Sequence, residues 1–133
     1  MLGSSAATAR PVEVRPGRRA TVTLIRPPVV VLPGALATHG PTPPLGAAYV
    51  AAALRDAGFP VQVIDGAGEA LDRSETIDSP IGPLQRIGLS LDAIVEAIDA
   101  KASVVGVSTM FLHEWPTVRE LCTRIKQLSL IHI

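Results

Sequence analysis

Three short runs of β-branched and apolar residues recur along the chain, each bounded by proline, glycine or polar residues. The runs Thr21–Ile25 and Val61–Asp65 have the composition of β-strands. The third run, 103–108, is continuously apolar, which is typical of a strand buried on both faces of a parallel sheet. We therefore expect three strands.

The first helical segment lies between the first two of these strands. It begins at Pro44 or Leu45, since proline suits a first helical turn, and it extends to about Ala57. Gly58 then fits the C-terminal position of a helix. Because alanine makes up much of this segment, the helix should lie close to the sheet.

Two later segments place apolar residues three and four positions apart, which predicts a helix with one buried face for each. Ser90 is a suitable N-cap for the first of them. The second begins near Trp115, and its Glu120 precedes Arg124 by one helical turn. The two predicted apolar faces are Leu91, Ile94, Val95 and Ile98 in the first helix, and Val118, Leu121, Cys122 and Ile125 in the second.

The resulting order, β-α-β-α-β-α, predicts an α/β fold. We expect a Rossmann-like (flavodoxin-like) three-layer domain whose parallel strands follow the order 2-1-3, with an incomplete sheet. The segments 27–44 and 66–89 carry proline, glycine and serine without clear periodicity, so we expect two long loops. Within the first loop, 29–32 is either a short extended piece or packs over the sheet edge.

The domain organisation follows from the same pattern. Residues 1–19 are small, polar and basic, and we expect a disordered lead-in. Residues 20–127 should form one domain. The pattern breaks at its end, so we expect residues 128–133 to be a foreign or truncated tail.

Charge and composition exclude several functions. Lys plus Arg and Asp plus Glu are both 12, and aromatic residues make up 3%, which argues against a nucleic-acid partner. One cysteine allows neither a disulfide framework nor a cysteine-based metal site. We see no apolar run of the roughly 20 residues that cross a membrane and no secretory signal, so we expect a cytoplasmic protein without a membrane partner.

The strongest functional signal is a resemblance carried by several motifs in a fixed order. They are Arg26-Pro-Pro28, Pro43-Pro-Leu-Gly-Ala-Ala-Tyr49, Ala52-Ala-Leu-Arg-Asp-Ala-Gly58, Val61-Gln-Val-Ile-Asp65, Val104-Val-Gly-Val-Ser-Thr-Met110 and Trp115-Pro-Thr-Val118. Over about residues 20–127, the chain resembles the N-terminal cobalamin-binding domain of B12-dependent radical SAM enzymes.

The resemblance implies a cofactor and a partner domain. In this family the domain holds cobalamin against a radical SAM barrel, whose Cys-x-x-x-Cys-x-x-Cys motif carries a [4Fe-4S] cluster that works with S-adenosylmethionine. The present chain lacks that motif, so any methyl transfer or radical rearrangement would belong to an intact parent enzyme. It also lacks the Asp-x-His-x-x-Gly motif of other cobalamin proteins. Because Ala37 and Thr42 stand where that motif has Asp and Gly, we expect His39 to be a loop residue.

The candidate cofactor-binding residues lie where strands end and helices begin, the edge at which parallel sheets bind ligands. The glycines would let a planar ring approach the backbone, and Ser108 and Thr109 could bond to amides of the cofactor. Asp65 is either a ligand contact or a turn former. The full set is Thr42, Pro43, Pro44, Leu45, Gly46, Asp65, Gly106, Ser108 and Thr109; we assign no catalytic residue and no metal ligand.

Other interpretations stay open. The prolines and Gly46 could serve only the geometry of a helix start, and the domain could be a stand-alone Rossmann-like module that binds a nucleotide or a partner protein. Gly66-Ala-Gly68 has part of a dinucleotide fingerprint, but no helix follows at once, so we expect a turn. A receiver-like signalling domain is weaker, because Arg26-Pro-Pro28 stands where an acidic cluster is needed. Neither His113 nor Glu114 has a partner that would indicate a site, and Cys122 should be a small buried hydrophobe.

Overall fold

Three parallel strands form the centre of the structure, a computed structural model that describes residues 20–34 and 42–128. They are β1 (Thr21–Arg26), β3 (Val61–Asp65) and β6 (Ala102–Val107), hydrogen-bonded in the order β3-β1-β6. The predicted order, with the first strand between the other two, is confirmed. All three strands therefore end at one common edge of the sheet.

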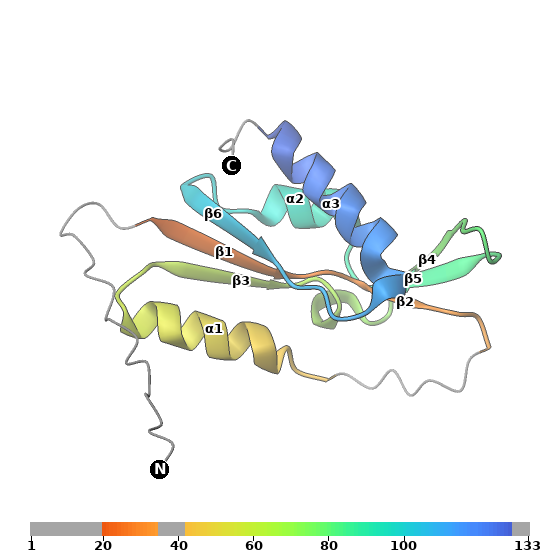
Figure 1. The fold of residues 1–133 in the computed structure, drawn as a ribbon, viewed down its shortest axis with the longest axis horizontal. Coiled ribbons are helices and arrows are strands. Elements are labelled where there is room, and N and C mark those ends of the chain that lie inside the picture. Colours follow the sequence, from red (N-terminus) through yellow and green to blue (C-terminus); the bar gives the residue numbers. More distant parts are fainter. Residues whose placement is uncertain (1–19, 35–41, 129–133) are drawn as a thin grey trace, which may run out of the picture.

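Helices cover both faces of this sheet (Figure 1). On one face, α1 (Leu45–Asp56) packs mainly on β3 and β1. On the other lie α2 (Leu91–Ala97) and α3 (Trp115–Gln127). These helices confirm the three predicted segments to within a residue or two, and the three layers confirm the α/β Rossmann-like class.

The local signals in the second half of the chain act as expected. The Ser90 hydroxyl oxygen accepts a hydrogen bond from the Ala93 N–H at 3.2 Å and caps α2. Arg124 donates to Glu120 one turn earlier, at 2.6 Å. The core lies between the sheet and these two helices, and its buried members are Ile25, Ile64, Leu91, Ile94, Ile98, Ala102, Leu121 and Ile125.

The prediction of a long loop over 66–89 is wrong. A second, antiparallel sheet joins β2 (Val29–Val31), β5 (Leu84–Ile87) and β4 (Ser74–Ile77) in the order β2-β5-β4, and it extends past the ends of the parallel strands (Figure 1). Of the two alternatives for 29–32, the short extended piece is the one that forms, as β2. The hairpin of β4 and β5 was not predicted because Arg86 occupies an inward position of β5, where an alternating strand pattern would have an apolar residue.

β6 also differs from the expectation that both of its faces are buried. It is an edge strand, and Val104 is 40% exposed. A register shift between Thr21 and Val22 brings Val104, rather than Ser103, opposite Val22 on the α1 side of the sheet. Since α1 packs mainly on β3 and β1, that side of β6 is covered poorly.

Some predictions lie outside the described residues. They concern the lead-in over 1–19, the loop residue His39, and all of the tail after Leu128.

Candidate functional site

A pocket of about 930 Å³ opens at the carboxyl edge of the parallel sheet. Its walls are the ends of β1 and β3, the segment that leads into α1, the turn after β3 and the loop after β6; β2 and β5 each add one side chain. Ligand pockets span roughly 300–1,000 Å³, so this one is large enough for a bulky cofactor. Its place agrees with the edge at which parallel sheets bind ligands.

Seven of the nine predicted residues line this pocket. They are Thr42, Pro43, Pro44, Leu45, Gly46, Asp65 and Ser108. Thr109 is an exposed neighbour of Ser108 but is not among the lining residues.

The two glycines predicted to admit a planar ring have different surroundings. A Cβ on Gly46 would meet no atom within 4 Å, so the pocket wall is open there. A Cβ on Gly106 would lie 3.1 Å from Cδ2 of Leu24. Gly106 therefore makes room for a neighbouring strand inside the sheet, and it does not line the pocket.

Asp65 acts as a turn former and also faces the pocket. Its Oδ1 accepts the N–H of Gly68 at 3.0 Å. The predicted turn is present at Gly66 and Ala67, but a short 3-10 helix, η1 (Gly68–Ala70), follows it at once, contrary to the expectation. A Cβ on Gly68 would lie 2.3 Å from Oδ2 of Asp65, so this glycine is required by the close approach of the carboxylate. The glycine pair serves the turn, and nothing in it favours a dinucleotide.

Arg26 is a site residue that sequence reasoning missed. Its Nη1 donates to the carbonyl oxygen of Thr42 at 2.7 Å and lies 3.3 Å from Oδ1 of Asp65. One guanidinium thus joins the end of β1, the end of β3 and the segment before α1. The available signal was its position as the last residue of a buried strand, at the ligand edge.

Glu114 is the second residue that was missed. It lines the pocket at 9% exposure, and burial raises the pKa of its carboxyl. His113, Arg26 and the backbone N–H groups of Phe111 and Val30 act against that rise. His113 is exposed and stacks on Phe111, with ring centroids 5.6 Å apart. The sequence offered only adjacent polar residues, which could not reveal that one of them turns inward.

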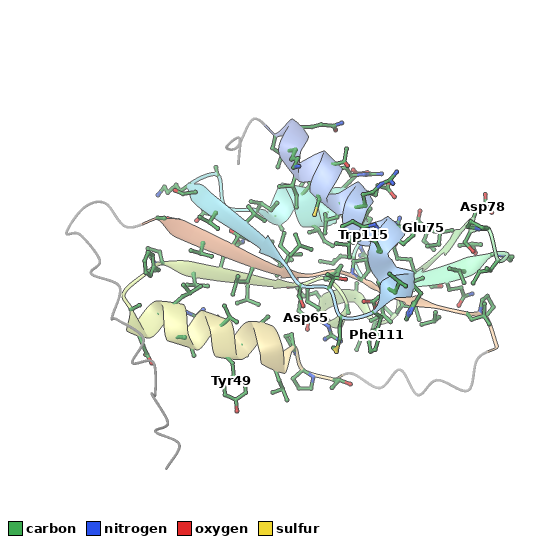
Figure 2. All side chains as sticks on the ribbon, viewed as in Figure 1. Tyr49, Asp65, Glu75, Asp78, Phe111 and Trp115 are labelled. Carbon is green, nitrogen blue, oxygen red and sulfur yellow. The ribbon has the colours of Figure 1, made fainter. Side chains whose placement is uncertain are left out.

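The rim of the pocket is apolar. Its large exposed side chains are Leu45, Leu71, Met110 and Phe111. In Figure 2, Asp65 and Phe111 lie at the same end of the parallel sheet, whereas Tyr49 projects outward from α1. Exposed apolar side chains around a polar floor suit a ligand with both a large hydrophobic surface and hydrogen-bonding groups.

Within residues 20–34 and 42–128, no group of three or more His, Cys, Asp or Glu side chains could hold a metal ion. In the same residues, no helix has the length and apolar character needed to cross a membrane.

Cys122 was expected to be a buried side chain. In the structure it is only half-buried on α3.

The fold is that of a Rossmann-like domain, with a pocket at the carboxyl edge of its parallel sheet. The family model of the B12 binding domain matches residues 32–133, more than half of the chain. The chain therefore belongs to the B12 binding domain family, which supports cobalamin as its ligand. Searches of curated proteins and of solved structures gave no match.

The residues at the pocket fit cobalamin as a ligand. The volume, the open wall at Gly46 and the apolar rim suit a corrin ring. Arg26, Asp65 and Ser108 supply donors and acceptors of the kind that amide side chains require.

Proposed function

We propose that this chain binds cobalamin in the pocket at the carboxyl edge of the parallel sheet, as the N-terminal domain of a B12-dependent radical SAM enzyme. The observation that carries the proposal is the coincidence of the family match with a pocket lined by the predicted segment Thr42–Gly46. When bound, cobalamin would supply the methyl transfer or radical rearrangement, in concert with S-adenosylmethionine and a [4Fe-4S] cluster on a barrel in cis.

The residues of this chain would bind and orient the cofactor. The apolar rim would cover part of the corrin, Gly46 would admit its edge, and the hydroxyl of Ser108 would bond to an amide. We assign no proton transfer and no catalytic residue to the chain. A nucleotide is a weaker candidate, because the glycine pattern after β3 is explained by the turn that Asp65 closes.

Titration of the full chain with hydroxocobalamin tests the binding. We expect saturable changes in the visible spectrum. The variant Gly46→Phe should weaken binding at least about tenfold, because its ring adds bulk at the pocket wall. It should keep the fold, since a Cβ at this position meets no atom within 4 Å and glycine is a poor helix residue.

The matched control is Ala53→Phe, which places the same ring on an exposed position of α1 outside the pocket. It should bind like the wild type. A folded wild-type protein whose titration leaves the cobalamin spectrum unchanged would contradict cobalamin binding. Equal binding by both phenylalanine variants and the wild type would instead place the cofactor elsewhere on the domain.

The radical SAM context needs a separate test. We expect the reading frame of the source DNA to continue from the codon for Gln127 into a Cys-x-x-x-Cys-x-x-Cys motif. A frame that continues into a different domain would contradict this part of the proposal and leave cobalamin binding untouched.

A further inference from the structure

Arg26 connects two walls of the pocket. Its Nη1 reaches the Thr42 carbonyl oxygen at 2.7 Å on one side and the Asp65 carboxylate at 3.3 Å on the other. Asp65 is itself held by the N–H of Gly68 at 3.0 Å. A continuous chain of polar contacts therefore crosses the floor of the pocket, from the turn after β3 to the segment before α1.

The segment before α1 has few backbone donors to hold it in place. Pro43 and Pro44 lack an N–H group, and the N-cap residue Pro44 makes no side-chain capping bond. The N–H of Leu45 donates to the Pro43 carbonyl oxygen two residues earlier, in a tight turn, and the N–H of Ala48 donates to the Pro44 carbonyl oxygen at the start of α1. Both are internal to the segment, so neither ties it to the sheet. The bond from Arg26 to the Thr42 carbonyl oxygen joins the segment to the end of β1.

We propose that Arg26 is the positioning residue of this pocket: its guanidinium holds the start of α1 against Asp65 and so sets the width of the pocket before a ligand arrives. Arg26 lies outside the residues 32–133 that match the family. The role of Arg26 in ligand affinity rests on the proposed function. Its role in fixing the segment before α1 is independent of the proposed function.

The chemistry of the side chain supports this role. Both contacts come from Nη1, whose two N–H groups are held in the rigid plane of the guanidinium, so one nitrogen can serve the carbonyl and the carboxylate together; a lysine ammonium is a flexible point charge without that fixed plane. The Arg26 side chain is 24% exposed, and the nearby Glu114 adds a second acidic group. A pocket whose wall is fixed in advance loses less conformational entropy when it binds.

The first measurement is the affinity of the full chain for hydroxocobalamin. We expect Arg26→Gln to weaken binding by about tenfold or more, because a bond from a charged donor is lost and the wall is free to move. The matched control is Arg55→Gln, since Arg55 also donates to a backbone carbonyl, that of Val61 at 3.3 Å, but lies at the far end of α1. It should change binding by less than about twofold.

The second measurement needs no ligand. Amide hydrogen exchange should be faster at Leu45 and Ala48 in Arg26→Gln than in the wild type, and unchanged in Arg55→Gln. Arg26→Lys should recover part of both effects, because its ammonium can serve only one of the two partners well.

These measurements separate the two proposals. If the wild type does not bind cobalamin but Arg26→Gln still loosens the start of α1, the proposed function fails and the positioning of the segment stands. If Arg26→Gln binds like the wild type, or binds weakly with unchanged exchange, the positioning role is overturned. Should Arg26→Gln not fold, Arg26→Lys decides: wild-type affinity and exchange in that variant would overturn the proposal as well.

Discussion

The two faces of the parallel sheet are covered in different ways. Between the sheet and α2 and α3, large aliphatic side chains are buried almost completely, and Leu121 and Ile94 are both 0% exposed. On the opposite face, Ala51 is the buried residue of α1, while Tyr49 is 77% exposed. Hydrophobic burial is therefore concentrated on one face, and the helix that opens the pocket is anchored more lightly.

The comparison predicts that stability and binding respond to different residues. Leu121→Ala should lower the free energy of unfolding by about 2–5 kcal/mol, because it removes a fully buried side chain and leaves a cavity. Urea denaturation followed by circular dichroism measures this. The control Tyr49→Ala, on the outer side of α1, should stay within about 0.5 kcal/mol of the wild type. Similar losses from both substitutions would contradict the contrast between the faces.

A smaller effect is expected at the edge of the pocket. Gly68→Ala should cost about 1 kcal/mol, because its methyl group displaces the Asp65 carboxylate and breaks the bond to the Gly68 N–H. The thermal midpoint measures the loss. Gly46→Ala is the control: its Cβ meets no atom within 4 Å, so it should be neutral or slightly stabilising. A greater loss from Gly46→Ala would show that the start of α1 has no room for a methyl group at this position.

The smallest effect concerns Glu114, and it depends on pH. Burial raises the pKa of this carboxyl in the folded state above its pKa in the unfolded state. At a pH between these two pKa values, the folded protein therefore holds a proton that the unfolded chain has released. Wild-type stability from this group is therefore present below the unfolded pKa and is lost as the pH rises through the folded pKa. Glu114→Gln removes that loss, so its melting temperature relative to the wild type should be higher at about pH 8 than at about pH 4.

The exposed Glu96 supplies the control for this titration. Glu96→Gln should give a difference from the wild type that changes little over the same range. If Glu114→Gln lowers the melting temperature equally at both pH values, its carboxyl would act mainly as an acceptor for the N–H groups of Val30 and Phe111, and the burial argument would fail.

The elements that the sequence predicted correctly are those with local signals. α2 was predictable because an N-cap serine and four apolar residues at helical spacing occur within nine residues. The order of the parallel strands followed from their alternation with helices. The antiparallel sheet could not be found this way, since β2 and β5 are far apart in the chain and the charged Arg86 occupies an inward position of β5.

The candidate site shows the same division. The segment Thr42–Gly46 was predictable because proline and glycine mark the start of a helix at the ligand edge. Arg26 and Glu114 were missed, because their roles depend on partners from other elements. Arg26 contacts a carbonyl oxygen, which no side-chain pattern records, and Glu114 is buried only when the loop after β6 folds back over β2.

The pocket is assembled from segments that lie far apart in the chain, from Arg26 at the end of β1 to Glu114 just before α3. Local unfolding of any one of them dismantles a wall, so a molecule held there would bind only the completely folded domain. Its free concentration would then act on the folding equilibrium of the whole chain by mass action, and each tenfold increase above the dissociation constant would add about 1.4 kcal/mol to stability. A greater abundance of the bound molecule would thereby raise the fraction of domains that are folded.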